Sequence, residues 1–188
     1  MSDRNRKDVI IKAALAIITS DGAGKLSFDT LAERTGFTKS GILYHFPTKH
    51  ALLQALVNYA YAPFFVLYAR LVTDQQPHAG RTVLGYIRAL NEGCGEGADT
   101  YAAVTAIVSE QPVLLDVHRN LYRTVRQDII ADGGDFAEQW AIIATLDGLW
   151  FDDMARLYSI TSQERQQIVD HCLRQAHQLT GQPADVRL

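Results

Sequence analysis

Cysteine is scarce in this sequence, and long apolar runs are missing from it. The 188 residues include two cysteines, Cys94 and Cys172, which lie far apart and outside any metal-ligand spacing. This scarcity argues against a disulfide framework and favours free thiols in a reducing compartment. Cys94 lies in a glycine-rich stretch, where a redox role is the weaker alternative because no neighbouring residue is placed to activate the thiol.

No apolar run reaches the roughly 18 residues that a membrane span needs. The first ten residues, MSDRNRKDVI, also lack the apolar core of a signal peptide. We therefore expect a soluble, cytoplasmic protein without a membrane partner.

Catalytic and metal-binding motifs are missing as well. Four histidines follow residue 77, but the chain has no H-x-x-x-H or H-E-x-x-H spacing, glycine-rich phosphate loop or nucleophile elbow. Asp152 and Asp153 are adjacent in sequence, so they point to different faces of a helix. The sequence therefore predicts no enzyme activity, no metal site and no cofactor.

Helical periodicity runs through nearly all of the sequence and predicts an all-α fold of about nine helices. Glycine and proline cluster at a few points between the periodic segments. The expected helices cover 3–20, a short segment after Ser27, 39–45, 49–73, 82–92, 99–110, 112–131, 136–158 and 162–179.

Charge is unevenly distributed along the chain, whose net charge is −3. Residues 1–50 contain 8 Lys and Arg against 5 Asp and Glu, whereas residues 51–188 contain 10 against 16. A basic first quarter on an acidic body favours one face for phosphates, which gives modest support to nucleic-acid binding.

The most informative segment lies between residues 27 and 46. Ser27 and Thr38 are placed to cap two short helices, and Gly36 between them tolerates the positive φ that a tight turn needs. The second helix presents small or hydrogen-bonding side chains and includes Gly41, a poor helix former. A helix of this kind suits close approach to a duplex, so the segment predicts a helix-turn-helix that reads the major groove.

The stretch LAERTGFTKSGILYHFPTKHALL, residues 31–53, resembles the DNA-binding signature of the TetR family, the tetracycline-repressor-like regulators. The glycine in the turn, the core around Tyr44 and the Pro-x-Lys entry to the next helix match in order and spacing. The specific resemblance covers about residues 8–57, and beyond it only the helical layout matches. It implies a three-helix DNA-binding domain at residues 1–47 and a ligand-binding and dimerisation domain at 48–188, with the helix at 49–73 as connector.

The resemblance also implies roles for single residues. Ser27 and Thr38 would contact phosphates at helix N-termini, and Lys39, Ser40 and Gly41 would approach base edges. Tyr44 and His45 would reach the backbone or the groove wall, and Lys49 would pair with a further phosphate. One departure is His50, where the family usually has an acidic residue that suits the helix dipole. Tyr44 also suits a half-buried core position, and His45 a solvated position without function.

The last two expected helices carry apolar residues at steps of three and four, a pattern typical of a bundle seam. We expect this seam to form a homodimer, with packing inside one subunit as the alternative. The expected interface residues are Phe136, Trp140, Ile143, Asp147, Trp150, Met154, Ile168, Cys172 and Ala176.

The family fold implies a ligand pocket within the body. Aromatic walls with few polar groups suit an apolar or aromatic small molecule, although each of these residues also suits a plain core position. The candidate lining is Phe64, Phe65, Tyr68, Tyr86, Tyr101, Tyr122, Trp140 and Trp150. The resemblance thus implies a ligand-responsive transcriptional regulator that, by the family default, is a repressor released from a double-stranded DNA operator by a small-molecule effector. The alternative is a helical protein-interaction module that has lost DNA binding.

Overall fold

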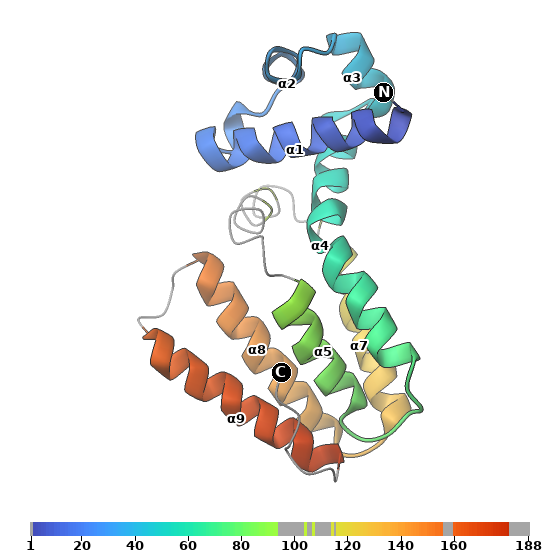
Figure 1. Ribbon diagram of the computed structural model, residues 1–188, viewed down its shortest axis with the longest axis vertical. Helices are drawn as coiled ribbons and strands as arrows, with labels where there is room; N and C mark the ends of the chain where they lie inside the picture. Colours follow the sequence, from blue (N-terminus) through green and yellow to red (C-terminus); the bar gives the residue numbers. More distant parts are fainter. Residues whose placement is uncertain are drawn as a thin grey trace. The chain divides into compact units, whose positions relative to one another are not determined.

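The computed structural model describes residues 2–93, 104, 107, 114, 116–155 and 160–180 of the chain. Within these residues the regular structure is helical and no strand occurs, which confirms the all-α prediction (Figure 1). The elements are α1 Asp3–Asp21, the 3₁₀ turn η1 Ala23–Lys25, α2 Phe28–Thr35, α3 Lys39–His45, α4 Lys49–Thr73, α5 Arg81–Gly93, α7 Asp116–Asp132, α8 Phe136–Ala155 and α9 Ser162–Thr180.

The described contacts divide the chain into two compact units. Unit 1 contains the residues up to Ala62 with the described part of 97–117, and unit 2 contains 63–93 with the described residues from His118 onward. The division falls inside α4, at Pro63, so this helix belongs to both units. The expected functional boundary at residues 47–48 stays a prediction.

Unit 1 is built on the apolar face of α1. The buried residues Ile10, Ala14 and Ile17 recur at helical spacing and pack toward η1 and α2. The helix begins at a Ser2 cap, whose hydroxyl accepts a bond from Asn5 N, and it ends at Gly22, where φ is +89°. Gly22 ends α1 directly before η1, which leads to the Ser27 cap of α2.

The helices of unit 2 (Figure 1) contribute buried side chains to an apolar cluster. Helix α5 contacts both α8 and α9, and these two helices contact each other. The buried members of the cluster are Phe64, Tyr68, Val72, Val83, Tyr86, Ile87, Ala89, Leu121, Val125, Ile129, Ile142, Ile143, Leu146, Cys172 and Ala176. The core is therefore rich in aromatic side chains from α4 and α5.

A buried polar network ties the helix ends of unit 2 together. Arg81 Nη2 lies 2.6 Å from Asp132 Oδ1, and Arg81 Nη1 donates to the carbonyls of Val72 and Gln75 at 2.9 and 3.0 Å. The other Asp132 oxygen accepts bonds from the Thr82 backbone and hydroxyl at 2.8 and 2.7 Å. The network joins the end of α4, the start of α5 and the end of α7.

Helix α4 is long and apolar enough to cross a membrane by length and composition alone. In its most apolar stretch 44% is buried within the protein, and core helices of soluble proteins meet the same criterion. The prediction that no apolar run reaches the length of a membrane span is corrected to this extent.

Candidate DNA-binding interface

Helix α3 begins at Thr38, as the sequence predicts. The Thr38 hydroxyl accepts a bond from Gly41 N at 3.1 Å and lies 3.2 Å from Ser40 Oγ. A Cβ added at Gly41 would lie 3.1 Å from the same Thr38 oxygen, which is a tight contact. Glycine at position 41 thus leaves room for the Thr38 cap, which orients the exposed N-terminus of α3.

Both ends of α2, the helix that precedes α3, are fixed by local structure. Ser27 Oγ accepts a bond from Thr30 N at 3.1 Å, and Thr30 Oγ1 accepts one from Ser27 N at 2.9 Å, which forms a capping box. Gly36 ends α2 in the left-handed conformation, with φ of +72°. Leu31 and Ile42 are fully buried and join the two helices, so a rigid base supports α3.

Lys39 and Lys49, two exposed cations of unit 1, differ in their partners. Lys39 Nζ forms an ion pair with Asp29 of α2, at 2.9 Å from Oδ1, and both side chains are more than half exposed. Lys49 is exposed at the start of α4 and forms no ion pair with any described residue. Lys49 is therefore directly available to a phosphate, whereas Lys39 would have to exchange Asp29 for DNA.

Tyr44 and His45 take opposite positions although they are adjacent. Tyr44 is 79% exposed, so it is not a core aromatic. The His45 side chain is only 5% exposed, and its Nδ1 lies 3.4 Å from Asp3 Oδ1 of α1. In this conformation His45 links α1 to α3 and is not solvated as in the alternative interpretation. Its expected contact with DNA stays a prediction.

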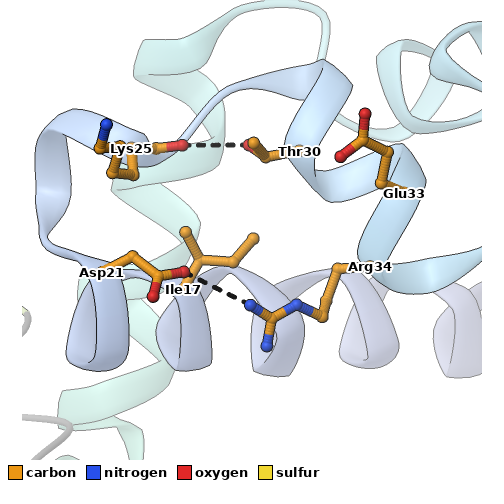
Figure 2. Close-up of a pocket in the computed structure, with 6 residues that line it drawn as sticks. All are labelled: Ile17, Asp21, Lys25, Thr30, Glu33 and Arg34. Atoms are coloured by element: carbon orange, nitrogen blue, oxygen red, sulfur yellow. Dashed lines mark hydrogen bonds and ion pairs between the residues drawn. The ribbon is translucent and has the colours of Figure 1, made fainter.

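An open groove of about 710 Å³ lies between α1, η1 and α2, and Figure 2 shows the residues that line it. Thr30 Oγ1 donates to the Lys25 carbonyl at 3.0 Å, and Arg34 Nη2 lies 3.4 Å from Asp21 Oδ2. The groove also includes Ile17 and Glu33 and none of the expected DNA-contacting residues. Its paired charges of both signs give no preference for a phosphate.

Two family models match this chain. The model described as bacterial regulatory proteins of the tetR family matches residues 10–56. The model described as a tetracyclin repressor-like C-terminal domain matches residues 80–177, more than half of the chain. The chain belongs to the TetR family.

Several solved structures share the fold of this protein across nearly the whole chain. The multidrug binding protein EbrR complexed with malachite green is 24% identical, with 90% of this chain and 97% of that chain covered and a TM-score of 0.69. A transcriptional regulator from Rhodococcus sp. Rha1 is 18% identical, with coverages of 96% and 99% and a TM-score of 0.62. A TetR family transcriptional regulator from Pseudomonas syringae pv. tomato str. DC3000 is 21% identical, with coverages of 95% and 97% and a TM-score of 0.57. A comparison with curated protein sequences finds no match.

The expected pocket residues of this TetR-family chain lie in or around the core of unit 2. Phe64, Tyr68 and Tyr86 are buried in the apolar cluster. Phe65, Tyr122 and Trp140 are partly buried and pack against the cluster, and Trp150 is also partly buried. Tyr101, like Cys94, lies outside the described residues. The pocket that these residues are expected to line stays a prediction.

The expected dimer seam is partly corrected by the structure. Ile143, Cys172 and Ala176 are buried inside their own subunit, and Asp147 is hydrogen-bonded there to tyrosines of α5 and α7. The periodic apolar residues reflect the packing of α8 and α9 on each other and on α5. Phe136 is exposed, and Trp140, Trp150 and Ile168 are partly exposed, whereas the Met154 side chain lies outside the described residues.

The two thiols and the acidic side chains give no sign of redox or metal chemistry where they are described. Cys172 is buried, and burial raises the pKa of its thiol, which disfavours the reactive thiolate. In the described part of the chain no group of three or more His, Cys, Asp or Glu side chains is placed to hold a metal ion.

Replacement of Asp29 by asparagine is expected to strengthen binding to any duplex at low salt. The expected gain is only about two- to fivefold, because an exposed ion pair such as Lys39–Asp29 contributes little free energy. The change removes a negative charge from the expected DNA-facing surface and frees the Lys39 ammonium. Fluorescence anisotropy with a labelled duplex at two salt concentrations measures the gain. Asp21→Asn, which breaks the exposed pair with Arg34, is the matched control. Weaker binding of the Asp29 variant would instead mean that the pair positions Lys39 for DNA.

Proposed function

We propose that this TetR-family chain is a ligand-responsive transcriptional repressor that binds a DNA operator as a homodimer. The observation that carries the proposal is the exposed, capped α3 on a buried base. Its first turn carries Thr38, Lys39 and Ser40, and Tyr44 projects into solvent one turn later. Short polar side chains at the start of an exposed helix suit direct contact with base edges in the major groove.

In this proposal the residues divide into two classes. Lys49 and the helix N-termini at Ser27 and Thr38 contact phosphates, which fixes the position of the protein on the duplex. Lys39 and Ser40 contact base edges, and Gly41 lets the helix approach closely. Tyr44 contacts the sugar-phosphate backbone or the groove wall. His45 is left out of this set, because its ring faces Asp3 within unit 1.

The two classes are separated by paired substitutions. Lys49→Ala is expected to weaken binding to all duplexes alike and to reduce the slope of log affinity against log salt by about one. Lys39→Ala and Ser40→Ala are expected to change sequence preference as well, by about 1–3 kcal/mol at the positions they contact. The operator is first identified by selecting the genomic fragments that the protein binds. Fluorescence anisotropy titrations with this operator and with a scrambled duplex then measure the change in affinity and the change in sequence preference.

Lys12→Ala is the matched control, because it removes one exposed positive charge from α1, a helix that carries none of the proposed DNA contacts. Its effect on duplex affinity is expected to be small at physiological salt, where charges beyond about 8 Å are screened. Unchanged affinity of the Lys49 variant would sink the docking described above. Failure of the full-length chain to bind any fragment at low salt would favour the alternative, a helical interaction module.

The effector in this proposal is a small molecule with apolar or aromatic faces that binds within unit 2. The aromatic cluster around Phe64, Tyr68 and Tyr86 supports this, and so does the fold shared with a multidrug binding protein complexed with malachite green. Helix α4 begins with Lys49 and ends in unit 2, so it gives ligand binding a covalent route to the DNA-contacting end. Release follows if the ligand favours a state in which the two recognition helices are further apart.

The dimer contact in this proposal is the outer face of α8. Small or apolar residues recur there at alternating steps of four and three, as helix-to-helix packing requires. They are exposed or partly exposed, and they are Ala137, Ala141, Ala144, Gly148 and Phe151. This face takes the place of the expected seam, whose central members are buried inside the subunit.

A further inference from the structure

The aromatic core of unit 2 contains a carboxylate with an unusual set of partners. Asp147 of α8 accepts a bond at its Oδ2 from the Tyr122 hydroxyl of α7 at 2.8 Å. Its Oδ1 accepts a bond from the Tyr86 hydroxyl of α5 at 2.5 Å. Three helices thus place one acidic group and two phenols at a single point.

No cation among the described residues balances the charge of Asp147. Its partners among the described residues are two neutral hydroxyls, and no described Lys, Arg or His forms an ion pair with it. The acid of the neighbouring network differs, since Asp132 is paired with Arg81 at 2.6 Å. An uncompensated carboxylate in an apolar setting is costly, so a positively charged partner at this point would stabilise it.

The surroundings of this carboxylate are aromatic on two sides. The inner side is buried, with Tyr86 edge-to-face against Phe64 at 5.3 Å and Tyr68 stacked on Phe64 at 6.0 Å. The outer side is only partly buried, with Tyr122 edge-to-face against Trp140 at 6.2 Å. The faces of such rings attract a cation, most strongly when water is excluded.

The two phenols hold the carboxylate without neutralising it. A carboxylate has about four acceptor positions, and the tyrosines occupy two of them. Asp147 and Tyr122 are only partly buried, so the remaining positions suit a positively charged group. We propose that Asp147, oriented by Tyr86 and Tyr122, is the recognition point for an organic cation with aromatic faces. This inference rests on the proposed function, because it gives the charge of the effector that unit 2 binds.

The test compares two ions of nearly the same size and shape and opposite charge, tetraphenylphosphonium and tetraphenylborate. Calorimetric titration of the full-length chain is expected to give at least about tenfold tighter binding of the phosphonium, equal to about 1.4 kcal/mol. The smaller cation N-methylquinolinium is titrated in parallel, so that the result does not depend on one shape. Equal binding of the two tetraphenyl ions, or binding of neither cation, overturns the proposal.

Asp147→Asn keeps the size of the side chain and removes its charge. It is expected to weaken phosphonium binding about tenfold and to abolish the preference over tetraphenylborate. The matched control is Asp128→Asn, because Asp128 also accepts a tyrosine bond in this unit, from Tyr68 at 2.7 Å. The control is expected to retain the preference. An Asp147 variant that retains it also overturns the proposal.

The stability of the Asp147 variant gives an independent measurement. Burial raises the pKa of Asp147, although the bonds from Tyr86 and Tyr122 act in the opposite direction. A carboxyl whose pKa is raised on folding stabilises the folded state below its unfolded value, and this contribution is lost as pH rises through the folded value. The asparagine variant is therefore expected to gain stability relative to the parent over the range in which pH rises above the unfolded value of about 4. Thermal melts across this range also show that the variant folds.

The outcome is separable from that of the proposed function. Duplex binding is measured on the same preparation without any added ion. If the chain binds its duplex but shows no preference for the cation, this inference fails and the regulator proposal stands. If it binds the cation through Asp147 but binds no duplex, the ligand site stands and the regulator proposal fails.

Discussion

An Asp132→Ala variant is expected to lose about 3–5 kcal/mol of its free energy of unfolding, because it leaves a buried guanidinium without its counter-ion. The Asp132 side chain is fully buried and that of Arg81 is nearly so. The same substitution removes the carboxylate oxygen that accepts two hydrogen bonds from Thr82, at the positive end of α5. Chemical denaturation followed by tryptophan fluorescence measures the loss in unit 2, since both tryptophans of the chain belong to α8.

The double variant Arg81→Met with Asp132→Leu is the control for this effect. It removes both charges and fills the space with apolar atoms, so it is expected to recover much of the lost stability. The single Arg81→Met variant is expected to be destabilised as well, because it leaves the Asp132 carboxylate buried without a counter-ion. A loss below about 1 kcal/mol for Asp132→Ala would mean that water reaches the network in solution.

Local features of the fold could be predicted from sequence because short-range bonds decide them. Ser27 and Thr38 cap α2 and α3 as expected, and Gly36 has the expected positive φ. The Thr161-x-x-Glu164 pattern forms a capping box, in which Glu164 accepts a bond from the Thr161 backbone N–H at 2.7 Å. Each of these features needs only residues within three or four positions of one another.

Long-range pairing could not be predicted in the same way. Periodicity shows that one face of a helix is buried, but it does not show whether the burying partner is in the same chain. The residues Ile143, Cys172 and Ala176 are for this reason predicted at a dimer contact but buried within the subunit. The partners of Asp147 could not be predicted for the same reason, since Tyr86 and Tyr122 lie 61 and 25 residues away in the sequence.

The DNA-facing helix shows the same limit at shorter range. The polar character of α3 is evident in the sequence, and the structure exposes Tyr44 as a groove-contacting role requires. The structure also turns His45 inward toward Asp3, 42 positions earlier in the chain, and pairs Lys39 with Asp29. A family motif assigns roles by position, whereas the neighbours of each side chain decide whether it is free to act.

The Gly148→Leu variant is expected to separate the proposed dimer into subunits while leaving each subunit folded. A Cβ added at Gly148 meets nothing within 4 Å in its own chain, and leucine favours a helix over glycine by about 0.8–1 kcal/mol. On the outer face of α8 the larger side chain keeps a second helix from close approach. Light scattering after size-exclusion chromatography is expected to give a mass near 20.9 kDa for the variant and about twice that for the parent.

Loss of the dimer has a large consequence for DNA, because it removes the advantage of two linked recognition helices. Operator affinity is expected to fall about 10²–10⁴-fold, whereas affinity for nonspecific duplex changes far less. Ala131→Leu enlarges an exposed side chain on α7 and is the matched control, with no change of mass or affinity expected. A dimeric Gly148 variant with unchanged circular dichroism would remove the outer face of α8 from the interface. Dissociation without loss of operator affinity would show instead that a single subunit carries the whole recognition.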